Sequence, residues 1–471
     1  MIREEVICAI STPPGMGAIA VIRVSGAGSI ELVNRLFRSP SGKRLIEAKP
    51  NSVHFGSIEW EGRLLDEVLV SLFHAPHSFT GEESVEIACH GSVYIQQKLM
   101  ELLISQGARL AKAGEFTRRA FRNGKFDLSQ AEAVADLIAS TSAASHRVAM
   151  NQMRGGFARR LTTLRDKLLQ FVSLIELELD FAEEDVEFAN REELYGLVVD
   201  IEGEIDSLAS SFQLGNAIKS GIPVAIIGET NVGKSTLLNL LLQEDKAIVS
   251  DIHGTTRDAI EDTMNIGGVL FRFIDTAGIR HTTDAIETMG IERTYRKVEQ
   301  ASIVLWVIDL TAPVEKSIEL ASSIAPKLTG KEVILLFNKS DLSPEATLQA
   351  TSQAILQAIE GVLPEIALHH LFISAKKRLG TEKLQELLVQ AAAIPSIGEE
   401  EVIVTNLRHY ESLTKALDAI RRVKEGLESG ISHDLLTQDI RECMFYLGEI
   451  TGQITTDEVL GNIFSKFCIG K

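Results

Sequence analysis

Five short apolar runs between residues 217 and 383 constrain the fold of this chain most strongly. Stretches with helical periodicity separate these runs, which read IPVAIIG, GVLFRFIDTAG, SIVLWVIDL, EVILLFNKSD and LHHLFISAK. Apolar runs of this kind are typical of strands that are covered on both faces of a parallel sheet. We therefore predict an α/β domain over residues 217–383, with helices on both sides of the sheet.

The segment GETNVGKST, residues 228–236, follows the first run and fits the pattern GxxxxGK[ST] between a strand and a helix. In such a loop Gly228 and Gly233 let the backbone curl, so that its N–H groups face phosphates. Lys234 then reaches the β- and γ-phosphates, and the hydroxyl of Ser235 binds Mg²⁺. The motif predicts a Ras-like P-loop site for a nucleoside triphosphate.

Two later segments extend this site. In GTTRD, residues 254–258, either Thr255 or Thr256 is expected to close over Mg²⁺ and the γ-phosphate. DTAG, residues 275–278, follows a strand and supplies Asp275 near the metal.

The base is predicted by NKSD, residues 338–341, which follows another strand. The Asp341 carboxylate can accept hydrogen bonds from N1–H and from the exocyclic amine of guanine, and adenine offers no such donor pair. SAK, residues 374–376, fits the loop whose backbone N–H meets guanine O6. The sequence therefore predicts GTP.

One position departs from the Ras-like pattern. The residue after DTAG is Ile279, where that pattern has a glutamine that orients the attacking water. Asn231 and the GTTRD segment match GTPases that bind K⁺ beside the phosphates, where the cation does the work of an arginine finger. Glu287 is the best downstream candidate to orient water, and an ordinary exposed helix residue is the alternative interpretation.

The flanking regions have other patterns. Residues 1–120 mix alternating strands with one helical stretch and predict an α+β domain, whereas residues 121–216 and 384–471 read as helices. Ser129 and Glu132 are expected to form a capping box. We predict one helical domain into which the α/β domain is inserted, although two separate bundles would give the same pattern.

Charge is unevenly distributed along the chain. The net charge is −18, but residues 1–125 hold 15 Lys and Arg against 13 Asp and Glu. The net charge of −18 argues against a protein that coats nucleic acid with its whole surface. Contact with a polyanion is expected near RRAFRNGK, residues 118–125, which reads equally well as a solvated helix face.

The four cysteines, Cys8, Cys89, Cys443 and Cys468, show no CxxC spacing, so neither disulfides nor a structural zinc are expected and at least three should be buried thiols. The terminal FCIGK fits a prenylation box poorly, because its last residues are Gly470 and Lys471. With neither a signal-peptide pattern nor an apolar run of membrane-spanning length, we expect a cytoplasmic protein without a membrane segment.

Several segments outside the nucleotide motifs are specific: TPPGMGAIAVIRVSG, SFTGEESVEIACHG, GEFTRRAFRNGKFDLSQAEAVADLI and the terminal FCIGK. With the nucleotide motifs they resemble the MnmE (TrmE) family of tRNA-modification GTPases over essentially the full chain. The resemblance implies a homodimer with an N-terminal domain that dimerises and binds a tetrahydrofolate derivative, 5-formyl- or 5,10-methylene-tetrahydrofolate. It also implies a flavoprotein partner, MnmG, in a heterotetramer or larger complex that adds an aminomethyl or carboxymethylaminomethyl group at C5 of the wobble uridine, position 34, of certain tRNAs.

The resemblance also implies roles for individual residues. Mg²⁺ would be held by Ser235 and Thr256, and Glu287 falls where the family has its water-orienting glutamate. The implied K⁺ ligands are Asn231, Ser250, Ile252 and Thr255. Motifs and resemblance together assign GTP contacts to Asn231, Val232, Gly233, Lys234, Ser235, Thr236, Ser250, Asp251, Ile252, His253, Gly254, Thr255, Thr256, Asp275, Thr276, Ala277, Gly278, Asn338, Lys339, Asp341, Ser374, Ala375 and Lys376.

For the folate, the resemblance points to Arg23, Glu86, Lys125 and Lys471. A pterin edge suits a carboxylate such as Glu86, and glutamyl carboxylates suit Arg or Lys. Cys468 would lie beside the one-carbon donor as a candidate for acid–base or covalent chemistry.

An alternative function is a GTP-dependent switch in ribosome assembly or signalling, which the nucleotide motifs alone do not separate from a modification enzyme. The flanking segments and the net charge of −20 over residues 126–471 favour the modification enzyme. A stand-alone folate enzyme with a regulatory GTPase domain is a third interpretation. It leaves the missing redox cofactor motif unexplained.

Overall fold

The computed structural model describes residues 5–180, 191–246, 262–274, 295–342, 344–364, 366, 368–394, 398, 401–429, 431, 433–465 and 467–470. The chain divides into two compact units. Unit 1 comprises Met1–Ile138, Met150–Ile205 and Glu411–Lys471, and unit 2 comprises Ala139–Ala149 and Asp206–Tyr410.

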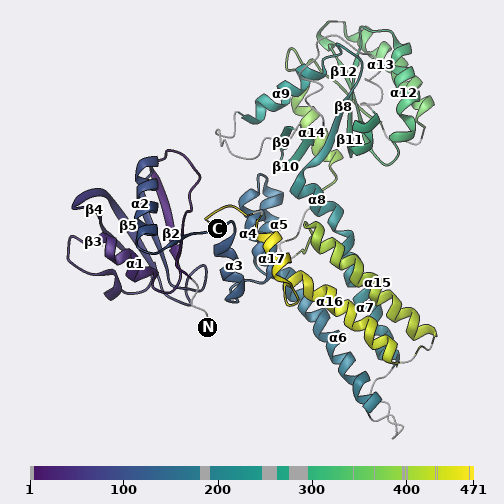
Figure 1. Cartoon of the computed structure of the whole chain (residues 1–471). Helices are drawn as coiled ribbons and strands as arrows, with labels where there is room; N and C mark the ends of the chain where they lie inside the picture. Colours follow the sequence, from purple (N-terminus) through teal and green to yellow (C-terminus); the bar gives the residue numbers. More distant parts are fainter. Residues whose placement is uncertain are drawn as a thin grey trace. The chain divides into compact units, whose positions relative to one another are not determined.

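The N-terminal part of unit 1 is an α+β layer, as predicted (Figure 1). Its seven-stranded sheet has the order β3-β4-β5-β6-β2-β1-β7, and its only parallel pair among the described strands is β1 with β7. The strands are β1 (Ile7–Ile10), β2 (Ile19–Ser25), β3 (Phe37–Arg38), β4 (Ser52–Trp60), β5 (Arg63–Phe73), β6 (Ser84–His90) and β7 (Arg109–Leu110). Alternate residues of the long strands are buried against α1 (Ser29–Leu36) and α2 (Val93–Ser105) in one core.

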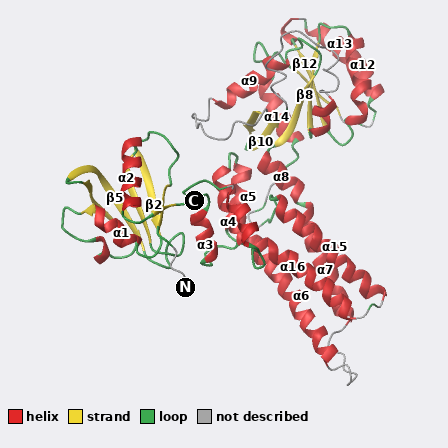
Figure 2. Cartoon of the chain, in the orientation of Figure 1, coloured by secondary structure: helices red, strands yellow, loops and turns green. Residues whose placement is uncertain are grey.

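The rest of unit 1 is helical (Figure 2). The helices whose residues lie wholly or mostly in this unit are α3 (Glu115–Arg122), α4 (Leu128–Ala139), α6 (Gly156–Asp180), α7 (Arg191–Ser210), α15 (Leu407–Ser429), α16 (His433–Thr451) and α17 (Asp457–Ser465), and α5 (Ala143–Met153) crosses its boundary. α16 packs along α6, and Glu202 of α7 pairs with Arg421 and Lys424 of α15. Helices from before and after the α/β segment thus share one bundle. This confirms a single helical domain with an insertion.

The predicted capping box at Ser129 and Glu132 is wrong. Asp127 precedes α4, and its carboxylate accepts from the backbone N–H of Gln130 at 3.0 Å, while Gln130 Oε1 accepts from the Asp127 N–H at 3.0 Å. Ser129 lies inside the helix and donates to Asp127 Oδ1 at 2.6 Å. The reciprocal cap is two residues earlier because the Asp127 carboxylate serves as the N-cap acceptor.

Unit 2 contains the predicted sheet, with the order β13-β12-β11-β8-β10-β9. The strands are β8 (Ile222–Ile227), β9 (Asp262–Ile266), β10 (Val269–Phe273), β11 (Ile303–Asp309), β12 (Glu332–Asn338) and β13 (Leu368–Phe372). The five predicted strands are parallel, but β9 pairs antiparallel with β10 at the edge and was not expected. Its sequence, DTMNI, mixes polar and apolar residues and lacks a continuous apolar run.

Helices cover both faces of this sheet. One core contains residues of α9 (Lys234–Lys246) and α14 (Thr381–Ala391), and the other contains residues of α12 (Val314–Ile324) and α13 (Glu345–Val362). α8 (Phe212–Ser220) leads into β8. Short 3₁₀ turns are Leu45–Glu47 in unit 1 and Ala325–Lys327 and Ser340–Leu342 in unit 2.

The structure also bears on the predictions about the cysteines and about membrane-spanning helices. All four cysteines are free thiols; Cys8, Cys89 and Cys443 are buried and Cys468 is exposed. Among the helices that the structure describes, none has the length and apolar character needed to span a bilayer.

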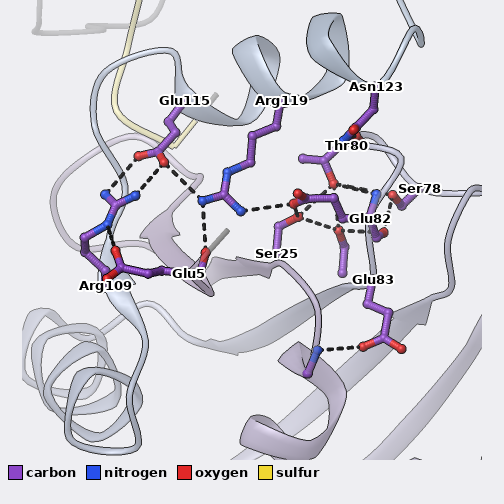
Figure 3. Close-up of polar contacts among 12 residues, drawn as sticks. Glu5, Ser25, Ser78, Thr80, Glu82, Glu83, Arg109, Glu115, Arg119 and Asn123 are labelled. Carbon is purple, nitrogen blue, oxygen red and sulfur yellow. Dashed lines mark hydrogen bonds and ion pairs between the residues drawn. The ribbon is translucent and has the colours of Figure 1, made fainter. Parts of the chain in front are cut away.

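Arg119 of α3 is a buried cation that joins the helix to the sheet (Figure 3). Its side chain is 4% exposed and donates to Glu82 Oε2 at 3.1 Å, to Glu115 Oε1 at 3.1 Å and to the Glu5 carbonyl at 2.9 Å. The alternative interpretation of residues 118–125 as a solvated helix face therefore does not hold for Arg119. Ion pairing offsets the cost of removing the guanidinium from water.

Replacing Arg119 with Met should lower the free energy of unfolding of unit 1 by about 3–5 kcal/mol, because Glu82 and Glu115 would lose a buried partner. Urea denaturation followed by circular dichroism measures this change. The matched variant Arg122→Met, at an exposed position of the same helix, should stay within about 0.5 kcal/mol of the parent. Equal stability of the two variants would contradict this account.

Candidate functional site

The P-loop joins β8 to α9 and depends on residues with positive φ. Gly228 has φ +139° and Gly233 has φ +103°, and Asn231 between them has φ +63°. A Cβ on Gly228 would lie 2.3 Å from the Val307 carbonyl oxygen, and one on Gly233 would lie 2.3 Å from Asn338 Nδ2. Both glycines are thus required by close approach as well as by conformation.

Lys234 begins α9 and turns its ammonium back onto the loop. Its Nζ donates to the carbonyl of Gly228 at 2.7 Å and to that of Glu229. Burial, together with the positive charge of Lys297, lowers the pKa of Lys234 to about 8. Ser235 and Thr236 follow in the first turn of the helix, the end at which a helix favours an anion.

Asn338 links the P-loop to the predicted base-binding loops. The residue is 3% exposed, and its side chain donates from Nδ2 to the Val232 carbonyl at 2.7 Å and accepts at Oδ1 from the Ala375 N–H at 3.1 Å. A single buried amide therefore fixes NKSD against both GETNVGKST and SAK. Lys339, at φ +62°, donates to Asp309 Oδ2 at 2.5 Å.

The carboxylate of Asp341 lies beside the SAK loop. Its Oδ1 accepts from Ser374 Oγ at 2.6 Å, and this hydrogen bond is the main reason that the pKa of Asp341 is lowered. The carboxylate is therefore ionised at neutral pH, when it only accepts hydrogen bonds. The exposed side chain of Lys376 follows in the same loop.

The other predicted nucleotide and metal contacts lie outside the described residues. They are Ser250, Asp251, Ile252, His253, Gly254, Thr255, Thr256, Asp275, Thr276, Ala277 and Gly278, together with the catalytic candidate Glu287. Of the predicted K⁺ ligands, the structure therefore describes Asn231 alone, and of the Mg²⁺ ligands Ser235 alone.

In unit 1, Arg23 and Glu86 face each other on the neighbouring strands β2 and β6. Their ion pair joins Nη2 to Oε1 at 2.8 Å, with a second bond from Nε at 3.0 Å. The guanidinium also lies 5.0 Å from the ring centroid of Phe79 and 5.7 Å from that of Phe116. Neither ring was predicted from the sequence, although Phe79 lies in SFTGEESVEIACHG and Phe116 lies in GEFTRRAFRNGKFDLSQAEAVADLI.

Lys125 approaches the same loop that carries Phe79. Its Nζ donates to the Pro76 carbonyl at 3.1 Å, and its side chain contacts the position where a Cβ on Gly81 would lie, at 3.3 Å. The structure therefore brings Lys125 to the loop that borders the Arg23–Glu86 pair.

The C-terminal tail lies against the end of β1, inside unit 1. The Gly470 carbonyl accepts from Ser11 Oγ at 3.2 Å, and a Cβ on Gly470, whose φ is +99°, would lie 2.4 Å from the Ile10 carbonyl oxygen. The Cys468 carbonyl accepts from the Gly114 N–H at 3.4 Å. Since β1 pairs with β2 beside Arg23, the tail reaches the neighbourhood of the folate candidates, although Lys471 lies outside the described residues.

Comparison with known protein families gives two matches that together span nearly the whole chain. Residues 6–125 match the family model described as GTP-binding protein TrmE N-terminus. Residues 128–468 match the model described as MnmE helical domain.

Relatives that align over the full length of the chain are named tRNA modification GTPase MnmE. The chain is 59% identical over 469 residues to the tRNA modification GTPase MnmE of Bacteroides fragilis, covering 99% of this chain and 100% of that protein. It is 52% identical over 475 residues to the protein of that name from Flavobacterium johnsoniae, covering all of both.

Matches among solved structures are partial. Era of Aquifex aeolicus, bound to GDP and AlF₄⁻, is 27% identical over 42% of this chain and 65% of that chain, with a TM-score of 0.27. The FeoB G-domain of Methanococcus jannaschii is 27% identical over 36% of this chain and 96% of that chain, with a TM-score of 0.25.

The lowered pKa of Lys234 predicts a pH dependence of nucleotide affinity. Below pH 8 the free protein holds this ammonium charged and attracts phosphates; above pH 8 the nucleotide must first restore the proton. The affinity should therefore fall by up to about tenfold per pH unit above pH 8. Titration with a fluorescent GDP analogue between pH 7 and 9 measures this, and Lys234→Met should bind weakly with a flatter profile. An unchanged affinity across this range in the parent protein would contradict the prediction.

Proposed function

Because the chain belongs to the MnmE family of tRNA-modification GTPases, we propose that it hydrolyses GTP with bound Mg²⁺ and K⁺ and acts with the flavoprotein MnmG on wobble uridine. The chain is a GTPase that acts in tRNA modification. In the proposal, a homodimer in complex with MnmG adds an aminomethyl or carboxymethylaminomethyl group at C5 of uridine 34 of certain tRNAs in the cytoplasm.

The proposal that the chain binds GTP rests on the two hydrogen bonds made by the buried side chain of Asn338. This side chain joins the phosphate loop to both loops expected around guanine, so the three segments form one site on the edge of the sheet. Beside it, the ionised Asp341 can accept from N1–H and the exocyclic amine of guanine. An adenine would leave these acceptors without donors, so the arrangement favours GTP over ATP.

The metal sites are proposed on residue chemistry. Ser235, at the start of α9, offers an oxygen ligand of the kind Mg²⁺ prefers, and Thr256 is the proposed second ligand. The P-loop fits a K⁺ site at Asn231, an exposed residue with positive φ whose side-chain amide offers an oxygen ligand. The other proposed K⁺ ligands are Ser250, Ile252 and Thr255. When bound, K⁺ supplies positive charge beside the phosphates, and Glu287 orients the attacking water.

The folate proposal rests on the Arg23–Glu86 pair and its aromatic surroundings. A carboxylate and a guanidinium match the donors and acceptors of a pterin edge, and the rings of Phe79 and Phe116 provide apolar surface beside them. Lys125 and the terminal Lys471 would hold the glutamyl carboxylates. The exposed thiol of Cys468, on the tail, would lie near the one-carbon group.

These roles imply a division of labour along the chain. We assign folate binding and dimerisation to residues 1–120 and nucleotide hydrolysis to residues 217–383. The helical residues 121–216 and 384–471 connect the two and present the tail.

Replacing KCl with NaCl should slow GTP hydrolysis at least about tenfold, since Na⁺ would not fill a site shaped for the larger cation. Asn231→Gly keeps the positive φ but removes the ligand, so its rate in KCl should fall to the NaCl level. Equal rates of the parent in the two salts would rule out the K⁺ proposal.

In KCl, Glu287→Ala should keep GTP affinity but lose about 10²-fold in kcat, with Asp284→Ala as the neighbouring control.

Gly470→Ala should displace the tail, because its Cβ would overlap the Ile10 carbonyl and alanine disfavours φ +99°. We expect loss of 5-formyl-tetrahydrofolate binding by calorimetry. Wobble modification should also be lost when the variant replaces the parent in cells and tRNA nucleosides are analysed by mass spectrometry.

The same change at Gly203, inside α7 with open space around its Cβ, should leave both readouts normal, and GTP hydrolysis should be unchanged in both variants. Normal folate binding by Gly470→Ala would refute the placement of the tail. Normal wobble nucleosides in cells lacking the chain altogether would refute the modification function.

A further inference from the structure

A cavity of about 700 Å³ in unit 1 has five cationic residues among the eleven that line it. The lining cations are Arg109, Lys112, Arg118, Arg119 and Arg122. Only two acidic residues, Glu5 and Glu115, line the cavity among the residues that the structure describes. This local excess of positive charge lies in a chain whose net charge is −18.

Two short helices form two walls of the cavity, and residues at and near β7, together with Glu5, complete the lining. On α3, four lining residues recur at positions i, i+3, i+4 and i+7, from Glu115 to Arg122, so one face of the helix carries the charges. On α17, Gly461, Phe464 and Ser465 form the facing wall, and only Phe464 of these three is large. α3 and α17 pack together, which fixes the two walls within one unit.

The acidic residues hold two of the guanidinium groups in place (Figure 3). Glu115 accepts from Arg109 at 2.6 Å and from Arg119 at 3.1 Å, and also from the Lys112 N–H at 2.9 Å. Burial alone would raise the pKa of Glu115, but these hydrogen bonds lower it to about 2, so the carboxylate stays charged at any working pH. The negative charge of Glu115 therefore serves to orient Arg109 and Arg119.

Three further cations line the cavity and are more accessible to solvent than Arg119. Lys112 and Arg122 are exposed, and Arg118 is partly exposed. Arginine pairs with phosphate oxygens through two parallel N–H groups, which makes an arginine-lined wall a typical phosphate contact. The acidic remainder of the chain would repel a polyanion elsewhere, so electrostatic attraction concentrates at this cavity.

We propose that this cavity binds the sugar–phosphate backbone of tRNA. The inference rests on the proposed function, which requires the chain to act on a tRNA, and it supplies a surface for that contact. Arg119 also donates to Glu82, and the loop of Glu82 carries Phe79, beside the folate candidate Arg23. A tRNA backbone bound in this cavity would therefore be connected, through Arg119 and Glu82, to the loop that borders the proposed folate site.

The test measures the affinity of the full chain for a tRNA transcript with uridine at the wobble position. Binding is monitored by fluorescence anisotropy between about 50 and 200 mM KCl. Lys112→Gln/Arg122→Gln removes two exposed cations and spares the buried Arg119. We expect affinity to fall about tenfold, and the slope of log affinity against log salt to shrink by about 1 for each phosphate that the variant no longer neutralises. The matched control is Lys43→Gln/Arg44→Gln, two exposed cations of the same unit outside the cavity.

Parent-like affinity and salt slope in the cavity variant would overturn the proposal, as would equal losses of affinity in the cavity and control variants. Weaker binding of a pentaglutamyl folate with unchanged tRNA binding would also overturn it, since the cavity would then hold the folate tail. GTP hydrolysis and 5-formyl-tetrahydrofolate binding should be normal in both variants. Failure of the proposed function itself is seen separately, as normal wobble nucleosides in cells that lack the chain.

Discussion

The buried guanidinium of Arg119 is the constraint on which the arrangement of unit 1 depends. A buried cation costs several kcal/mol unless its donors are paired, and here the acceptors come from the chain before β1, the loop before β6 and α3 itself. Pairing the two Nη groups of this guanidinium therefore fixes α3 against the sheet. Because α3 also carries Phe116, the aromatic surface beside Arg23 depends on the same ion pairs.

In unit 2, an uncharged buried group likewise joins separate segments of the chain. Asn338 is as buried as Arg119, but an amide costs far less to desolvate than an ion. Its two hydrogen bonds connect loops that follow different strands, and Gly233 has no side chain to obstruct the approach. Removing such a partner would leave the Val232 carbonyl without its donor and the Ala375 N–H without its acceptor, at roughly 1–3 kcal/mol for each buried group.

Local pattern was sufficient to predict most elements but not the contacts between them. Continuous apolar runs predicted the five parallel strands, whereas β9 has no such run and its pairing comes from the adjacent turn at Gly267 and Gly268. The cap at Asp127 was missed because Ser129 offers an equally good capping sequence two residues later. Within the site, the loop motifs predicted which residues meet, because parallel strands bring their carboxyl ends to one edge. Nothing local predicted that the side chain of Phe79 would face Arg23.

The position of the tail also depends on distant contacts. Ordering a terminal segment costs about 1–2 kcal/mol per residue in backbone entropy, and the hydrogen bonds from Ser11 and from the Gly114 N–H do not offset this for several residues. Apolar packing supplies the rest: the rings of Phe464 and Phe467 lie 5.3 Å apart and join a cluster with Phe121 and Leu128. The tail is thus held by aromatic residues that precede it, which leaves Cys468 exposed while Gly470 stays against β1. Since α17 carries Phe464 in both the tail cluster and the cationic cavity, a shift of this helix would move both together.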